Sequence, residues 1–229
     1  MASPVISHPT LTGRDFIYEP PNAELSIIHE DETIILVDKP TGLLSVPGKA
    51  AEHQDCLEFR MKDTFSDALL VHRLDMATSG IMVFARSPAS HRHLGLQFER
   101  RHVEKTYLAQ VWGKLNKPKG DIELPLICDW PNRPLQKVDH ENGKKAKTAW
   151  EVIEAFDDYS LVRLFPHTGR SHQLRVHMNE KNCPILGDRL YAHDFAFLQT
   201  QRLMLHAESL TLFHPDGGER LRFEAPSPF

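Results

Sequence analysis

Short apolar runs separated by polar turns recur along most of this chain and predict a protein rich in β-strands. Two β-branched runs, residues 26–29 and 33–37, are joined by the acidic stretch 30–32, which predicts a hairpin. Residues 81–85 form a third apolar run, and residues 106–111 alternate with the period of two that is typical of a strand. Further strands are predicted at residues 149–156, 161–165, 203–213 and 221–223.

Three other segments have the apolar period of a helix that packs on a core. The first covers residues 53–63. The second begins after Ser87-Pro88, an N-cap followed by proline at the first helical position, and runs to about residue 101. The third covers residues 172–181, with Ser171 as its expected N-cap. The residues expected to face inward are Leu57 and Met61 in the first helix, Leu94 and Phe98 in the second, and Leu174 and Met178 in the third.

The order of these elements indicates the fold class. Strands that come in groups, rather than in strict alternation with helices, favour an α+β domain with flanking helices around a mixed, mostly antiparallel central sheet. Residues 1–24 contain four prolines and little periodicity, so they are expected to form an N-terminal arm. A single domain is then expected over residues 25–229, because 229 residues with 41% hydrophobic content suffice for one core and at most two lobes.

Composition narrows the setting in which the protein works. No apolar run reaches the roughly 18 residues of a membrane span, and the first residues lack the basic and apolar segments of a secretory signal. The three cysteines are far apart and odd in number, which predicts neither a disulfide framework nor a Cys-x-x-Cys metal site. These features favour a cytoplasmic protein with reduced thiols.

Charge is distributed unevenly along the chain. The net charge of −4 argues mildly against an RNA partner, but residues 1–70 carry a net of −7 while residues 86–119 carry +6 and residues 133–147 carry +3. Phosphate binding depends on the local field rather than on the total. The two basic segments therefore predict either a nucleic-acid surface or, as is common for charge runs, solvated helix and loop faces.

One carboxylate stands out from its surroundings. Asp75 follows the apolar run 68–71 and precedes the run 81–85, so it is expected in a loop between two buried segments. A charge in that position is costly to desolvate unless it is paired or faces a cleft. Asp75 therefore belongs either to a structural ion pair or to a catalytic site.

The residues around Asp75 form the first of five motifs. His72-Arg73-Leu74-Asp75 with Thr78-Ser79-Gly80 resembles the catalytic motif of the RluA family of pseudouridine synthases. Four further motifs of that family are matched in the same order, at residues 105–109, 169–177, 184–188 and 203–207. The resemblance implies the pseudouridine synthase fold, with a central RNA-binding cleft, in its short form without an S4 domain.

The resemblance also implies three catalytic roles. Asp75 would be the essential carboxylate, Arg175 the cation that pairs with it, and Tyr107 the phenol that stacks on uracil and assists proton removal at C5. Without the motifs, Arg175 would be taken for a helix-surface arginine and Tyr107 for a half-buried strand tyrosine. A guanidinium beside a buried carboxylate would hold both its charge and its orientation.

Other residues are expected to bind the RNA. Arg73 would enter the space left by the flipped target nucleotide, and His72 beside it would be structural or contact a phosphate. Leu205 would pack against the base, or belong to the core. The remaining candidates for contact with RNA are Arg133 in the aromatic and basic segment 128–134, Arg170, Arg100 and Arg101.

The implied reaction breaks the N1–C1′ bond of uridine, rotates the uracil and rejoins it through C5. It changes no oxidation state and transfers no group, so no metal or cofactor is expected. The resemblance is closest to a subgroup that modifies the tRNA anticodon stem-loop, at uridine 32, and a 23S rRNA stem-loop, at uridine 746. A monomer is expected.

Four alternatives compete with this interpretation. A metal site is disfavoured because the spacings of His167, His172 and His177 match no zinc motif. A serine hydrolase is disfavoured because Ser79 lacks the Gly-x-Ser-x-Gly context. A nucleosidase would need a second positioned carboxylate. The strongest rival is a catalytically inactive RNA-binding protein of the same fold, although Asp75, Tyr107 and Arg175 are all retained.

Overall fold

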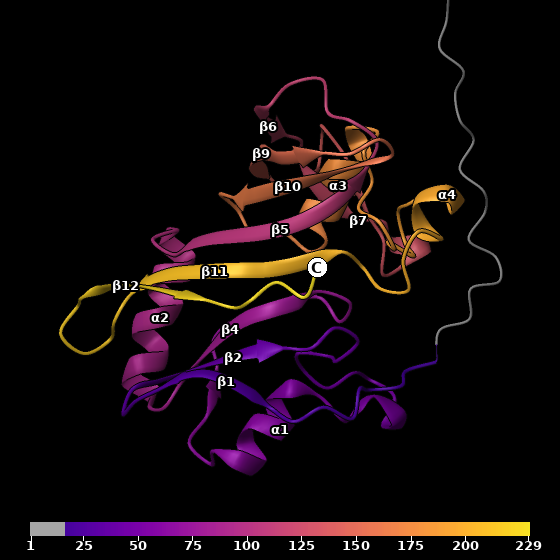
Figure 1. Cartoon of the computed structure of the whole chain (residues 1–229). Coiled ribbons are helices and arrows are strands. Elements are labelled where there is room, and N and C mark those ends of the chain that lie inside the picture. The colour runs from indigo at the N-terminus through magenta and orange to yellow at the C-terminus, as the bar shows by residue number, and fades with distance from the viewer. Residues whose placement is uncertain (1–16) are drawn as a thin grey trace, which may run out of the picture.

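A computed structural model describes residues 17–229, and most of its strands belong to one large sheet (Figure 1). The strands of that sheet are β1 (Ser26–Glu30), β2 (Ile34–Lys39), β3 (Leu69–Leu70), β4 (Ser79–Ala85), β5 (Glu104–Trp112), β6 (Lys119–Glu123), β9 (Lys147–Ala155), β10 (Tyr159–Pro166), β11 (Leu205–Phe213) and β12 (Arg220–Glu224). Their order is β1-β2-β4-β11-β5-β10-β9-β6, with β12 paired to β11 and β3 to β4. A separate small ribbon joins β7 (Leu126–Cys128) and β8 (Gln136–Val138).

The predicted fold class is confirmed. Among the strand pairs of the described residues, only β4 and β11 run parallel, and all the others are antiparallel. The expected hairpin is present as β1 and β2, and a turn at residues 157–158 joins β9 to β10. Eight residues of the predicted N-terminal arm, 17–24, are described and contain no helix or strand; the rest of the arm lies outside the described residues.

Three helices flank the sheet where the apolar periodicity predicted them: α1 (Leu57–Thr64), α2 (Pro88–Arg100) and α3 (Gln173–Glu180). The short α4 (Asp194–Phe197) and the single 3-10 turns η1 (Ala51–His53) and η2 (Trp130–Asn132) complete the helical elements of the described residues. At the start of α2, the Ser87 side chain accepts the N–H of Ser90, as predicted for its N-cap.

The predicted cap of α3 was wrong. The N-cap is His172 rather than Ser171, and His172 takes a left-handed conformation with φ 53° without a capping side chain. The Gln173 side chain explains the difference, because its Oε1 accepts both the N–H of Arg170 and the hydroxyl of Thr168. These two hydrogen bonds connect the turn before α3 to the first residue of the helix.

Two large apolar clusters form the core on the two halves of the sheet. One joins β2 and β4 to α1 and α2, and the other joins β5 and β10 to α3 and residues 183–186. The half-buried Tyr107 packs against both clusters, so it lies where the two halves meet. Across residues 17–229, no helix has the length and apolar character to cross a membrane.

Gly80 allows the parallel strands β4 and β11 to approach closely in the middle of the sheet. Its φ is +116°, and a Cβ built there would lie 2.3 Å from the carbonyl oxygen of Ala207, its partner in the pairing of the two strands. Both features exclude a side chain, since the backbone conformation is strained for other residues and the neighbouring backbone cannot move aside.

We therefore expect Gly80→Ala to lower the free energy of unfolding by about 3 kcal/mol, through backbone strain and overpacking. Urea denaturation followed by circular dichroism measures the change. Gly95→Ala is the matched control, because Gly95 lies inside α2 with no atom within 4 Å of the added Cβ. It should raise stability by roughly 0.5–1 kcal/mol. Equal effects of the two substitutions would refute the close-approach argument.

Candidate active site

Asp75 lies in the loop between β3 and β4 and faces two adjoining cavities. The first cavity, of about 280 Å³, is lined by Asp75, Tyr107, Arg170, His172, Arg175 and Leu205, among others. The second cavity has a volume of about 670 Å³. The carboxylate is 29% exposed, so it is open to a ligand while much of its surface is desolvated.

The loop that carries Asp75 is fixed by the last residue of β2 and by the segment that follows it. Lys39 is fully buried and donates hydrogen bonds to three backbone carbonyls, including that of Met76 at 3.0 Å. The Ser45 hydroxyl donates to the carbonyl of Leu74 at 2.7 Å and accepts the Leu74 N–H at 3.1 Å. Burial lowers the pKa of Lys39 to about 7, although the charge of Asp75 opposes this. These bonds hold both neighbours of Asp75 in place.

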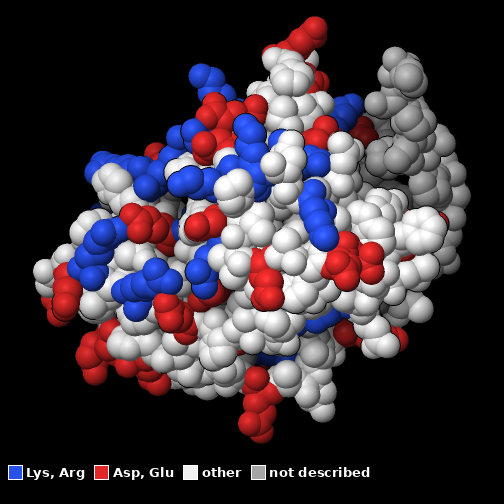
Figure 2. Space-filling view, turned by 45° about the horizontal axis from the view of Figure 1, so that its top comes forward, with Lys and Arg blue, Asp and Glu red and all other residues white. Residues whose placement is uncertain are grey.

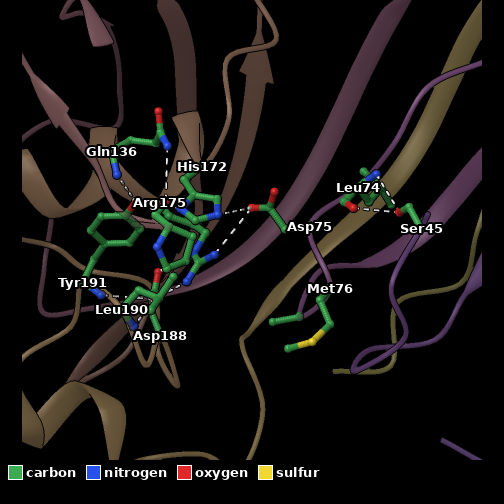
Figure 3. Close-up of polar contacts among 12 residues, drawn as sticks. Ser45, Leu74, Asp75, Met76, Gln136, His172, Arg175, Asp188, Leu190 and Tyr191 are labelled. Carbon is green, nitrogen blue, oxygen red and sulfur yellow. Dashed lines mark hydrogen bonds and ion pairs between the residues drawn. The ribbon is translucent and has the colours of Figure 1, made fainter. Parts of the chain in front are cut away.

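Arg175 reaches Asp75, but its main partner is a different carboxylate (Figure 3). Its Nε and one Nη donate to the two oxygens of Asp188, at 2.8 and 2.6 Å, and its other Nη lies 3.5 Å from Asp75 Oδ2. Burial alone would lower the pKa of Arg175, but the charge and hydrogen bonds of Asp188, with Asp75, raise it. The guanidinium therefore stays charged at 5% exposure.

His172 faces Asp75 from the same side as Arg175 (Figure 3), a role that sequence reasoning missed. Its Nε2 lies 3.9 Å from Asp75 Oδ2, and its Nδ1 lies 2.7 Å from the hydroxyl of Tyr191. That hydroxyl also accepts the backbone N–H of Gln136. Burial lowers the pKa of His172, with Asp75 opposing, which favours the neutral ring.

Tyr107 and Leu205 come to the first cavity from two neighbouring strands. Tyr107 on β5 is paired with Ala207 on β11, and Leu205 begins β11. Burial, and then the charge of Asp75, raise the pKa of Tyr107, so its phenol is neutral at physiological pH. Leu205 is 3% exposed, belongs to a core cluster and also lines the cavity, so its position is compatible with either of the roles that the sequence left open.

The two residues that precede Asp75 in its motif have different surroundings. Arg73 is exposed and lines both cavities. The Nε2 of His72 accepts the backbone N–H of Val83 at 3.1 Å, and its ring stacks on Phe98 at 4.6 Å between centroids. Burial, with a smaller effect of Lys105, lowers the pKa of His72 to about 3. Of the two roles considered for His72, these contacts favour the structural one.

The other predicted RNA-binding arginines differ in their relation to the two cavities. Arg170 lines the first cavity and donates to the carbonyl of Lys145. Arg133 lines the second cavity, with its guanidinium carbon 3.3 Å from the centre of the exposed Trp130 ring. Arg100 and Arg101, at the end of α2, line neither cavity.

The surface charge follows the division seen in the sequence. Figure 2 shows Lys and Arg side chains gathered on the upper left of one face, while Asp and Glu dominate its lower edge. The lower part of the molecule in Figure 1 contains β1, β2 and α1, which belong to the acidic first 70 residues. Polyanion binding is favoured on the basic part.

The histidines of the rejected metal hypothesis do not converge. His172 faces Asp75, whereas His177 is buried beside Thr148 and the carbonyl of Leu124. His167 is exposed at the end of β10. In the part of the chain that the structure describes, no three His, Cys, Asp or Glu side chains are arranged to hold a metal ion.

Asp188 is expected to contribute strongly to stability. Asp188→Asn leaves Arg175 charged and buried without its carboxylate, so we expect the free energy of unfolding to fall by about 3 kcal/mol. Asp55→Asn is the matched control, because Asp55 makes the same two-bond pair with Arg60 at the surface. That pair should be worth at most about 1 kcal/mol. Equal losses in urea denaturation would show that burial is not what makes the Asp188 pair important.

Comparison with known proteins gives concordant results. A family model described as RNA pseudouridylate synthase matches residues 33–180. A dual-specificity RNA pseudouridine synthase RluA from Escherichia coli strain K12 is 51% identical over 214 residues, which cover 93% of this chain and 98% of that protein. The protein of the same name from Yersinia pestis is 51% identical over 204 residues, covering 89% and 99%.

Solved structures agree with these sequence matches. The structure of human RNA pseudouridylate synthase domain containing 1 superposes with a TM-score of 0.77 at 28% identity, covering 92% of this chain and 87% of that one. Human RNA pseudouridylate synthase domain containing 4 gives a TM-score of 0.71 at 26% identity, covering 89% and 88%.

Proposed function

Because the chain belongs to the RNA pseudouridylate synthase family, we propose that it isomerises uridines in two RNAs, a tRNA anticodon stem-loop and a 23S rRNA stem-loop. The targets would be uridine 32 of the tRNA and uridine 746 of the rRNA. Support comes from relatives named as dual-specificity synthases that match 89% or more of this chain at about half identity. The observation that carries the proposal is the placement of Asp75 in a cavity beside Tyr107, Leu205 and the fixed Arg175.

The reaction assigns a clear task to Asp75. The N1–C1′ bond breaks, a C5–C1′ bond forms, the proton leaves C5, and N1 takes up a proton. Asp75 supplies the carboxylate. Three mechanisms are open, namely attack on C1′, attack on C6 and abstraction of a proton from the ribose, and each of them requires a carboxylate. Lys39 and Ser45 hold its loop, so the carboxylate is positioned before the substrate arrives.

The neighbouring residues would hold the target nucleotide. The neutral phenol of Tyr107 stacks on the uracil and keeps its hydroxyl near C5, while Leu205 packs on the base. Arg73 fills the space that the flipped nucleotide vacates, a role that fits its exposed position between the two cavities. Arg170, Arg133, Arg100 and Arg101 bind phosphates along the RNA.

The proposal also covers the organisation of the enzyme. Residues 25–229 would form the catalytic domain, working as a monomer in the cytoplasm. The isomerisation needs neither metal nor cofactor, because no electron or group is exchanged with another molecule.

The first test replaces the catalytic carboxylate. In Asp75→Asn, release of tritium from C5-tritiated uridine should fall by a factor on the order of a thousand or more, since the shape remains and only the charge is lost. Binding of the tRNA and rRNA hairpins should persist. Asp157→Asn is the control, because the Asp157 side chain is fully exposed and lines neither cavity.

The two hairpins are assayed separately. Tritium release from both hairpins by the unaltered enzyme and by Asp157→Asn, but not by Asp75→Asn, supports the dual-specificity synthase. Strong residual release from Asp75→Asn would remove Asp75 from its role, and tight binding without release by the unaltered enzyme would favour the inactive RNA-binding protein.

The basic end of α2 gives a second test. We expect Arg100→Ala with Arg101→Ala to weaken RNA binding and to flatten the plot of log K against log salt by about 1.4, if each arginine contacts one phosphate of unpaired RNA. Lys62→Ala with Lys181→Ala removes the same charge from exposed positions that line neither cavity. An identical slope in both double variants would show that the α2 arginines lie away from the RNA.

A further inference from the structure

The second cavity shares a wall with the first. Six residues line both cavities: Arg73, Leu74, Asp75, Ser171, His172 and Arg175. In Figure 3, Met76 and Leu190, which line only the second cavity, lie on either side of the space below Asp75. A ligand in the second cavity would therefore touch the same segment as the target nucleotide.

The walls that belong to the second cavity alone are mostly apolar. Leu44, Val46, Met76, Leu190 and Leu203 supply them. The polar groups among them are largely engaged within the protein, since the Ser45 hydroxyl is bonded to Leu74 and the Gln136 amide donates to a backbone carbonyl. Such walls suit a flat, weakly polar group and offer few contacts that would read its edges.

Cations surround this apolar space. Arg73 and Arg133 are exposed, and Arg189 also lines the cavity. The stacking of Arg133 on Trp130 limits the freedom of its guanidinium. Cations beside an apolar cavity fit a group that is flat and apolar at one end and anionic at the other, as a nucleotide is.

We propose that the second cavity binds the base of a nucleotide that adjoins the target uridine in the RNA chain. This inference rests on the proposed function. The shared wall makes the two occupants direct neighbours, with Arg73 lining both of their cavities. Two neighbouring bases are thus unstacked together when the enzyme engages its RNA.

The cavity would accept different bases at this position. Apolar contact and stacking do not distinguish bases strongly, whereas hydrogen bonds to base edges do. The enzyme then gains binding energy from the extruded neighbouring base, whichever base stands at that position. A site of this kind would accept RNA loops that differ in the base at this position.

Cys128 reports directly on the occupancy of this cavity. It is half-buried on β7 and lines only the second cavity, while Cys56 and Cys183, the two other cysteines of the chain, are buried. The experiment measures the rate of alkylation of Cys128 by N-ethylmaleimide with saturating RNA hairpin. Three hairpins are compared, one intact and two with an abasic site on the 5′ or 3′ side of the target. Cys128→Ser controls for labelling elsewhere.

The intact hairpin should slow alkylation at least about tenfold, in proportion to cavity occupancy. One of the two abasic hairpins should bind without slowing it, because its phosphates remain and only the base is gone. Equal protection by all three hairpins, or none by the intact one, would overturn the inference if tritium release is normal. Absence of tritium release from every hairpin would overturn the proposed function, and the inference with it.

A cavity-filling variant provides an independent measurement. Val46 lines only the second cavity, so Val46→Phe should raise KM for both hairpins about tenfold and change kcat less than about twofold. Ile153→Phe is the matched control, since Ile153 is exposed on β9 and lines neither cavity. An unchanged KM in Val46→Phe would contradict the proposal that a base occupies this cavity. The proposal would be supported if Val46→Phe no longer raises KM for the abasic hairpin that fails to protect Cys128.

Discussion

The site depends on one buried ion pair, between Arg175 and Asp188. Removing both charges from water is costly and is offset only when the remaining hydrogen-bonding positions are filled. Asp188 meets this condition by accepting the N–H groups of Leu190 and Tyr191 in addition to two bonds from Arg175. The pair therefore joins α3 to the loop after residue 187, and it leaves one guanidinium nitrogen free to face Asp75.

A second constraint comes from the middle of the sheet. β11 pairs with β4 on one side and β5 on the other, and this brings the loop before β4 close to Tyr107 and Leu205. The close approach at Gly80 permits that arrangement. Since Tyr107 packs on both core clusters, the residue proposed to hold the base is also part of the contact between the two halves of the protein.

The sequence predicts best what local signals determine. The β1–β2 hairpin, α2 with its Ser87 cap, and the antiparallel class all follow from short-range patterns and are confirmed. β6, β7, β8 and α4 were not predicted, because they are short and lack clear periodicity. Asp188 as partner of Arg175 and the contact of His172 with Asp75 were missed because both depend on tertiary packing. The sequence did offer one signal for Asp188, because the motif at residues 184–188 ends with it.

The contacts of Asp75 favour one of the two roles that the sequence left open for it. A structural ion pair would give Asp75 the short, paired bonds of the guanidinium, but those bonds go to Asp188, and Asp75 receives one contact at 3.5 Å. Its other neighbours, His172 and Tyr107, are neutral, because burial opposes charge on both rings. The negative charge of Asp75 is thus only partly compensated, and hydrogen bonds from Lys39 and Ser45 fix its loop. A carboxylate held in place but incompletely paired can respond to a substrate, whereas Asp188, which is saturated with donors, cannot.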